Sequence, residues 1–260
     1  MPTRLGQNFL QDPKHLQAIV LACDLTDSDV VIEIGAGSGS LTELISAKAK
    51  LVKAVELDSK LIPRLKLRLK RFPNTQIFNQ DIFDFFKTNP LPTDYKIIGN
   101  IPYYLTGKLI RRCLALEPKP KLIVFLLQKE VGNRIVIGSK LNFRRSILSL
   151  SVEIYVQAAI IGQVPAGAFS PKPKVDSVIL KLTPRLEPLI PQNQQADFFR
   201  LIKICFSSPR KTLFNNLKNG FAAYSSQKIV HCLASAGLDN KIRAERVTIS
   251  QWQKLLVKLF

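Results

Sequence analysis

The chain has 260 residues, of which 46% are hydrophobic, so it can bury one substantial core and carry a smaller second domain. Its 38 Lys and Arg residues against 19 Asp and Glu residues give a formal net charge of +19 at pH 7. This excess favours a polyanionic partner, because neutralising phosphates releases condensed counterions. We expect that partner to be a nucleic acid; an anionic membrane surface, or no special partner, is the alternative.

Neither a membrane anchor nor a metal is expected. The longest purely apolar runs, such as LIVFLL at 122–127, are far shorter than the roughly 20 residues of a membrane span, and the first residues contain no apolar signal core. The cysteines lie far apart in the sequence and remote from both histidines, which argues against a zinc site. Four unpatterned cysteines also predict reduced thiols, hence a cytoplasmic protein.

From residue 30 onward, short β-branched runs alternate with helical patterns. The expected strands are VVIEI (30–34), LVKAVE (51–56), TQIF (75–78), YKIIGN (95–100) and KLIVFLL (121–127). This alternation predicts βαβ units and therefore a mainly parallel α/β sheet. Two later runs, IYVQAAIIGQV and DSVILKL, are expected to complete the sheet as an antiparallel terminal hairpin.

A proline-studded segment at 183–195 interrupts the periodicity as a linker would. We predict an α/β domain over 1–184 and a small all-α domain over 185–260. The net charge is +11 over the first and +8 over the second, so the helical domain is the more basic per residue. This favours a nucleic-acid-binding role for 185–260; solvated lysine faces on the helices are the alternative.

The sequence GAGSGS places Gly35, Gly37 and Gly39 directly after the first βαβ strand. Glycines there let the backbone turn sharply and approach a ligand closely. Because NAD, FAD and S-adenosylmethionine proteins use similar loops, the motif alone leaves the cofactor open.

Acidic residues at the following strand ends favour a nucleoside ligand. Glu56 ends the second strand 21 residues after Gly35, where a carboxylate can accept hydrogen bonds from ribose hydroxyls. Asp81 follows the third strand, where it can accept from an adenine amino group, unless it is a solvent-facing loop acid. The loop lacks the last glycine of the dinucleotide motif, so we favour S-adenosylmethionine over NAD. For Asp58 we expect a helix N-cap.

The fourth strand ends in GNIPYY at 99–104, which completes a set of ordered motifs. With it the chain resembles the rRNA adenine N6-dimethyltransferases, specifically the KsgA branch. The matching stretches are GQNFLQD (6–12), VIEIGAGSGSLT (31–42), VELD (55–58), QDIFDF (80–85), GNIPYYLT (99–106), QKEVGNRI (128–135), FSPKPKVDSVILKL (169–182), RKTLFNNL (210–217) and IRAERVT (242–248).

The resemblance implies a Rossmann-like class I methyltransferase domain with S-adenosylmethionine as methyl donor. The implied acceptor is a hairpin of small-subunit (16S) rRNA with two adjacent adenosines, within a 30S precursor particle, and the implied state is a monomer. Carried over by position, the family's cofactor contacts are Asn8, Leu10, Gly35, Glu56, Asp81 and Asn100. For Asn8 and Leu10, simple packing of the N-terminal segment over the cleft is the alternative.

On the acceptor side, the resemblance makes Asn100, Pro102, Tyr103 and Phe169 the catalytic residues. The Asn100 side-chain oxygen and a carbonyl beside Pro102 are expected to aim the adenine N6, and Tyr103 to stack on the base. Phe169 is expected to cover its other face, with a core anchor as the alternative. Tyr104 is expected to be structural.

Two departures and two rival functions remain. The segment Asn142–Arg145 replaces a commoner aromatic–glycine–arginine pattern, and helix 128–135 contains Gly132 and Asn133 in place of better helix formers. Candidate phosphate contacts are Arg144, Arg145, Lys172 and Lys174, with solvated surface charge as the alternative.

The rival functions are an Erm-type large-subunit rRNA methyltransferase and a ribosome-assembly factor that keeps the fold without catalysis.

Overall fold

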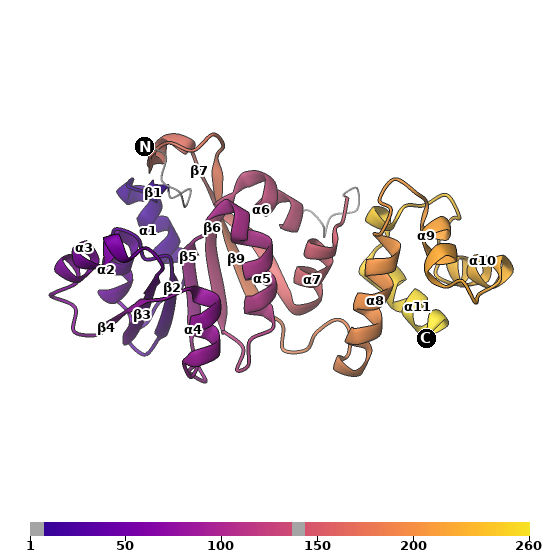
Figure 1. Ribbon diagram of the computed structural model, residues 1–260, viewed down its shortest axis with the longest axis horizontal. Coiled ribbons are helices and arrows are strands. Elements are labelled where there is room, and N and C mark those ends of the chain that lie inside the picture. The colour runs from indigo at the N-terminus through magenta and orange to yellow at the C-terminus, as the bar shows by residue number, and fades with distance from the viewer. Residues whose placement is uncertain (1–7, 137–143) are drawn as a thin grey trace. The chain divides into compact units, whose positions relative to one another are not determined.

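The computed structural model describes residues 8–136 and 144–260 (Figure 1). The chain divides into two compact units. The first comprises Met1–Asn133 and Gln157–Pro184, and the second Arg134–Val156 and Arg185–Phe260. Residues 144–155, which the sequence places in the α/β domain, therefore pack with the helical unit. The assignment of catalysis to one domain and RNA binding to the other stays a prediction.

A seven-stranded sheet forms the centre of the first unit. In spatial order its strands are β4 (Thr75–Asn79), β3 (Leu51–Glu56), β2 (Val30–Ile34), β5 (Lys96–Asn100), β6 (Leu122–Gln128), β9 (Ser177–Pro184) and β7 (Val156–Val164). The first five run parallel, and β9 runs antiparallel to β6 with Phe125 opposite Leu180. The predicted α/β class, mainly parallel with a terminal pair of late strands, is confirmed.

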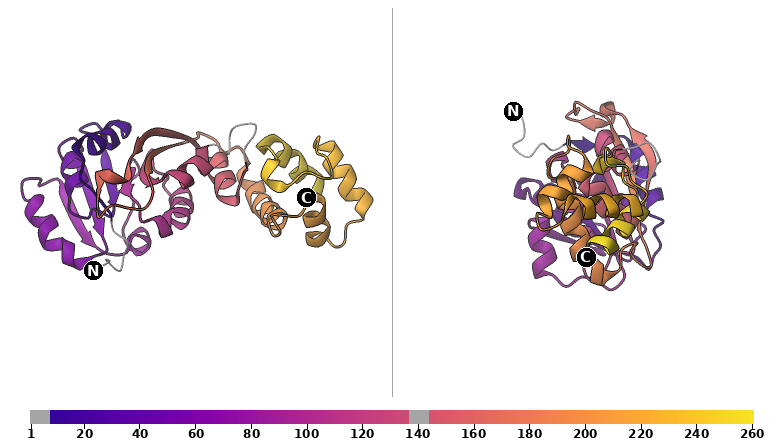
Figure 2. Two further views of the ribbon diagram at one scale, coloured as in Figure 1. Left: turned by 90° about the horizontal axis from the view of Figure 1, so that it is seen from above. Right: turned by 90° about the vertical axis from the view of Figure 1, so that its right-hand side faces the viewer.

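Helices cover both faces of this sheet (Figure 2, left). Helices α1 (Pro13–Ala22) and α2 (Ser40–Ser46) bury Ile19 and Ile45 against the strands, and α3 (Ile62–Arg68) packs Leu65 with Ala54 of β3. The opposite face, turned toward the viewer in Figure 1, carries α4 (Ile82–Thr88) and α5 (Thr106–Leu114). After β6 follows α6 (Lys129–Val136).

The carboxyl edge of the sheet collects the residues that the sequence marked. Because neighbouring parallel strands end at one edge, the ends of β2, β3, β4 and β5 lie together. A separate antiparallel pair, β1 (Phe9–Leu10) with β8 (Phe169–Ser170), lies in the same unit. Short 3-10 turns are η1 (Ser59–Leu61), η2 (Tyr103–Leu105), η4 (Ala166–Ala168), η5 (Gln192–Gln194) and η6 (Ala244–Arg246).

The second unit is helical. Its helices are α7 (Ile147–Tyr155), α8 (Gln195–Cys205), α9 (Leu213–Gly220), α10 (Ser226–Ser235) and α11 (Ile249–Leu259). They share one apolar core around the fully buried Trp252 and Phe198. The α7 helix joins this core through Leu150 and Ile154, and the Ile154 carbonyl accepts from the Leu189 backbone N–H at 2.9 Å. This packing explains why α7 belongs to the second unit. Within residues 8–136 and 144–260, no helix is long and apolar enough to cross a membrane.

Candidate active site

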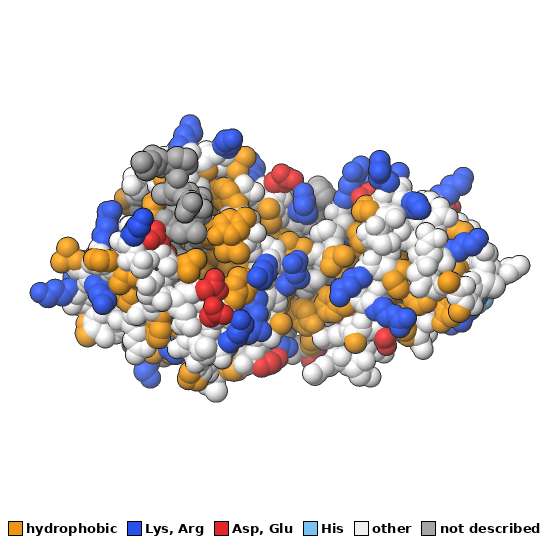
Figure 3. Space-filling model, viewed as in Figure 1, with side chains coloured by type: hydrophobic (Ala, Val, Ile, Leu, Met, Phe, Trp, Pro, Cys, Tyr) orange, Lys and Arg blue, Asp and Glu red, His pale blue; other side chains and the backbone are white. Residues whose placement is uncertain are grey.

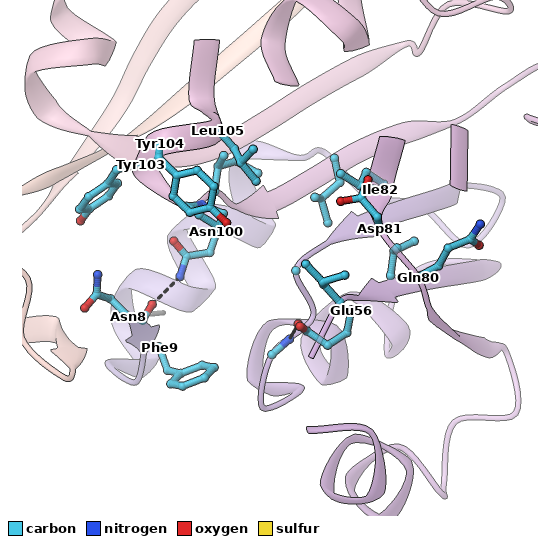
Figure 4. A pocket seen from close by; sticks show the side chains of 17 residues that line it. Asn8, Phe9, Glu56, Gln80, Asp81, Ile82, Asn100, Tyr103, Tyr104 and Leu105 are labelled. Carbon is cyan, nitrogen blue, oxygen red and sulfur yellow. Dashed lines mark hydrogen bonds between the residues drawn. The ribbon is translucent and has the colours of Figure 1, made fainter. Parts of the chain in front are cut away.

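A cavity opens in the first unit where the parallel strands end (Figure 4). One wall carries Asn8, Phe9, Asn100, Tyr103 and Tyr104, and the other carries Glu56, Gln80, Asp81 and Ile82. Of the residues predicted for the site, those that line this cavity are Asn8, Gly35, Glu56, Asp81, Asn100, Pro102 and Tyr103. The fold thus gathers residues as far apart in the chain as Asn8 and Asn100, which are separated by 92 positions.

The glycine loop forms the floor between the two walls. Gly35 and Gly37 have φ of 71° and 57°, a region that L side chains rarely adopt. A Cβ at Gly37 would lie 3.0 Å from Cε1 of Phe9, so any side chain would also crowd the space beside that ring. Glycine is therefore required here for the backbone conformation and for the room it leaves.

The Glu56 carboxylate is held in place by two backbone donors. Its Oε2 accepts from the Gly37 N–H and its Oε1 from the Asp58 N–H, both at 2.8 Å. The residue is buried, so its charge is compensated by these bonds rather than by water. Each oxygen keeps one further lone pair, and the side chain lies on the cavity wall, where it can accept from hydroxyl groups of a ligand.

Two aspartates of the same edge act as helix caps. Asp58 accepts from the Lys60 N–H at 3.0 Å and caps η1, which confirms the predicted N-cap. Asp81 accepts from the Phe83 N–H at 2.7 Å and caps α4, while it also lines the cavity. The cap uses Oδ1 of Asp81, so the carboxylate is fixed in direction and Oδ2 stays available to a ligand.

Asn100, at the end of β5, is bound to the N-terminal segment. Its Nδ2 donates to the Asn8 backbone carbonyl at 2.9 Å (Figure 4). A carbonyl only accepts, so the amide must turn its NH2 toward Asn8 and its oxygen away. No other hydrogen bond of the Asn100 side chain involves the described residues. The Oδ1 atom is therefore an oriented acceptor on the cavity wall.

The residues after Asn100 continue the same wall. The Pro102 carbonyl accepts from the Leu105 N–H at 3.0 Å, which closes the η2 turn and keeps one lone pair. The Tyr103 hydroxyl bonds to Oγ of Ser177 at 3.2 Å, so its ring is anchored at the far end from the backbone. Tyr104 lines the cavity but is 67% exposed.

Phe169 and Leu10 lie elsewhere. They are opposite each other across the β1–β8 pair, and both are buried in the core that α1 and α2 share with the sheet. Neither lines the main cavity; Leu10 lines a smaller neighbouring one. Phe169 is not among the residues that line the cavity with Tyr103, and its burial agrees with the alternative of a core anchor. Its role over the target base stays a prediction.

Glu33 is a residue that we did not single out from the sequence. It lies within β2, is 1% exposed, and lines the smaller cavity beside Gly35 and Gly37. Its Oε2 has no hydrogen-bond partner among the described residues. Burial raises the pKa of Glu33 to about 8, and the charge of Glu56 adds to this shift. An acid inside the apolar run VVIEI was the sequence signal for it.

Of the four candidate phosphate contacts, one is buried and three are exposed. Arg145 is buried and its Nε lies 3.2 Å from Glu153 Oε2, so the prediction that it is a surface phosphate contact is wrong. Arg144 lies 3.5 Å from Glu245 yet is 72% exposed, and Lys172 and Lys174 are exposed. The rest of the predicted departure, Asn142 and Phe143, lies outside the described residues.

Covalent or metal-dependent chemistry finds little support in the residues that the structure describes. No group of three or more His, Cys, Asp or Glu side chains in 8–136 and 144–260 can hold a metal ion. All four cysteines are free and buried. Burial raises the pKa of the Cys23 thiol to about 12 and the pKa values of Cys113 and Cys205 well above their usual range, so these are not thiolate nucleophiles.

The sheet order, the glycine loop and the acids at successive strand ends define a class I methyltransferase fold. The sequence profile of the family described as Ribosomal RNA adenine dimethylase matches residues 1–259. The chain belongs to this family and is an rRNA adenine dimethyltransferase, which confirms the resemblance seen in the sequence.

Individual relatives agree. The chain is 39% identical to Ribosomal RNA small subunit methyltransferase A of Dehalococcoides mccartyi, covering 96% of this chain and 86% of that protein. It is 36% identical to the protein of the same name from Alkaliphilus metalliredigens, with 96% and 89% covered.

Two solved structures share the fold over nearly the whole chain. A dimethyladenosine transferase from Plasmodium falciparum superposes with a TM-score of 0.81 at 27% identity, covering 96% of this chain and 97% of that one. The 23S rRNA methyltransferase ErmE superposes with a TM-score of 0.79, also at 27% identity, covering 97% and 99%. Since both kinds of enzyme share it, the fold alone does not select the rRNA substrate.

Proposed function

We propose that this protein transfers methyl groups from S-adenosylmethionine to N6 of two adjacent adenosines in the 3′-terminal hairpin of 16S rRNA, during assembly of the 30S subunit in the cytoplasm. The observation that carries the proposal is the Asn100 amide, whose oxygen is oriented on the cavity wall by the bond to Asn8. Two relatives at 36–39% identity are named Ribosomal RNA small subunit methyltransferase A, which supports the small subunit as the source of the substrate.

The residues of the cavity fit the cofactor. Gly35 and Gly37 leave a cradle that a Cβ would fill, and Glu56 offers an acceptor for ribose hydroxyls. Asp81 offers one for the adenine amino group. When bound, S-adenosylmethionine supplies an electrophilic methyl group on a sulfonium.

The acceptor amine needs aiming more than deprotonation. The N6 lone pair of adenine is delocalised into the ring, which makes the amine a poor nucleophile. Hydrogen bonds from its two hydrogens to Asn100 Oδ1 and to the Pro102 or Ile101 carbonyl favour a pyramidal nitrogen. The chain's contribution is to hold that nitrogen within about 3–3.5 Å of the methyl carbon and in line with the leaving group.

Tyr103 would supply the base platform. Its ring lines the cavity and its hydroxyl is fixed by Ser177, so a base can stack on it without first ordering the side chain. Stacking on an aromatic ring contributes about 1–3 kcal/mol. This is comparable to the few kcal/mol needed to extrude an adenine from its stack, so Tyr103 offsets much of that cost.

Two alternatives remain distinguishable. An enzyme of large-subunit rRNA shares the fold, and the match to ErmE keeps that candidate. The tail motifs RKTLFNNL and IRAERVT favour the small-subunit enzyme. A non-catalytic assembly factor would have no need for the oriented Asn100 and the glycine cradle, although a role in assembly beside catalysis is compatible with both.

The test incubates the protein with radiolabelled S-adenosylmethionine and three acceptors: undermethylated 30S particles, naked 16S rRNA and 50S precursors. We expect label in dimethyladenosine of the 30S particles. Label in the 50S precursors alone would select the large-subunit function, and no label in any adenine would leave the assembly factor. Light scattering of the free protein tests the monomeric state that the family resemblance implies.

A further inference from the structure

One face of α5 carries an aromatic ring and two cations in a row. Tyr104, Lys108 and Arg111 are spaced four and three residues apart, so they share a face of the helix and of the η2 turn that leads into it. They extend over about 10 Å along the axis. These three residues are called the α5 ridge. The sequence of α5, TGKLIRRCL, contains no acid.

The ridge charges are unpaired. Arg111 forms no hydrogen bond or ion pair with the described residues, and Lys108 contacts only the Phe83 ring, with Nζ 4.4 Å from its centroid. Both side chains are exposed, and Lys and Arg side chains gather over α5 in Figure 3. On the neighbouring α4, by contrast, Lys87 lies 2.9 Å from Asp84.

Helix electrostatics explains only part of this charge. Cations in a last turn, such as Arg111, interact favourably with the negative end of the helix dipole. Lys108 is in the first turn, where the dipole disfavours a cation, and it repels Arg111 on the same face. A stabilising role for the helix therefore does not account for the position of Lys108.

The ridge begins at the cavity. Pro102, Tyr103, Tyr104 and Leu105 all line the cavity, and the chain then enters α5 directly. Cations that follow an exposed aromatic ring are the pattern of surfaces that track a single strand of nucleic acid. Since the enzyme acts on rRNA, the strand that delivers the target base must pass this mouth.

We propose that the rRNA strand flanking the target adenosine runs along the α5 ridge, with Lys108 and Arg111 on its phosphates and Tyr104 stacked on a neighbouring base. The proposal rests on the cavity being the active site as proposed above. It gives Tyr104 a role in substrate binding rather than in structure alone.

The salt dependence of RNA binding tests the phosphate contacts. Binding of unmethylated 16S rRNA by the parent protein is compared with that of K108Q/R111Q and of K48Q/K50Q. The control removes the same charge from exposed lysines beside the amino end of β3, at the opposite edge of the sheet. We expect K108Q/R111Q to lower the slope of log K against log salt by about 1.4, and affinity in 0.1 M salt roughly 25-fold. K48Q/K50Q should leave the slope unchanged.

The ridge proposal would be overturned if the parent and K108Q/R111Q had the same salt slope of rRNA binding. It would also be overturned if both double variants lost the same rRNA affinity. The same holds if the parent protein does not bind the rRNA. Tyr104→Ala should weaken binding at least about 5-fold with the slope unchanged, whereas Tyr104→Phe keeps the ring and should bind as the parent does. Calorimetric binding of S-adenosylmethionine to each variant separates the two proposals. If the parent protein does not bind S-adenosylmethionine, the proposed cofactor is refuted. If every protein binds the cofactor normally but the salt slopes of rRNA binding do not differ, only the ridge is refuted.

Discussion

The side chain of Asn100 donates to the backbone carbonyl of Asn8 at 2.9 Å, although the two residues are 92 positions apart. The bond joins the last residue of β5 to the start of the described chain and fixes the direction of the Asn100 side-chain oxygen on the cavity wall. A single amide thus ties the N-terminal segment to the site and orients the acceptor that the proposed reaction needs.

Asn100→Ala should reduce methyl transfer at least 100-fold, because the adenine nitrogen loses its aiming acceptor. Binding of rRNA should change little, since the amide lies inside the cavity rather than on the basic surface. Label incorporation and filter binding measure the two effects. The K48Q/K50Q variant changes exposed lysines at the opposite edge of the sheet; it is the control and should transfer methyl groups as the parent does. Full transfer by Asn100→Ala would refute the aiming role.

Glu56→Ala should weaken S-adenosylmethionine binding by about 10- to 100-fold. Two backbone N–H groups, those of Gly37 and Asp58, lose their buried acceptor, and the ribose loses its partner. Titration calorimetry measures the affinity. Asp58→Ala removes only the η1 cap, at a cost of about 1 kcal/mol of stability, and should bind the cofactor normally. Equal affinity losses in both variants would indicate general loosening of the edge instead.

Glu33 should make the protein less stable as pH rises from about 4.5 to about 8. In that interval the unfolded carboxyl is ionised while the buried one keeps its proton, so the folded state binds more protons and the unfolding free energy falls with pH. Each unit of pKa difference corresponds to about 1.4 kcal/mol. Glu33→Gln should therefore gain stability relative to the parent toward pH 8 and level off above it. Urea unfolding of both proteins at several pH values measures this difference in unfolding free energy. A difference that did not change with pH would contradict the prediction.

Gly132→Ala should destabilise the first unit by about 1–3 kcal/mol, although alanine is the better helix former. A Cβ at Gly132 would overlap with Cγ2 of Val178 on β9. Asn133→Ala, one position on, is the control and should be neutral or slightly stabilising, since it improves helix propensity at a half-buried site. Denaturant midpoints compare the two, and a Gly132→Ala midpoint equal to that of the parent would show that α6 can shift away from β9.

Much of the molecule follows from local pattern. Alternating apolar runs predicted the parallel strands, and GAGSGS, Glu56, Asp81 and Asn100 marked the ends that meet in the cavity, because the ends of parallel strands share an edge. Helical periodicity predicted the second unit. It missed α7, because a helix read alone does not reveal which core its apolar face joins.

The remaining features depend on contacts between distant segments. Phe169, a candidate either for the base or for a core anchor, is buried opposite Leu10. Arg145, a candidate either for phosphate or for solvated surface charge, is buried and pairs with Glu153. Glu33 lies inside an apolar strand, and its buried Oε2 has no hydrogen-bond partner within 8–136 and 144–260. By itself the sequence determined where the strands end and which polar residues stand at those ends, because periodicity and motifs involve residues that are neighbours in the chain. Only the tertiary structure decided which side chains face the cavity and which the core, because burial and pairing depend on partners far away in the chain.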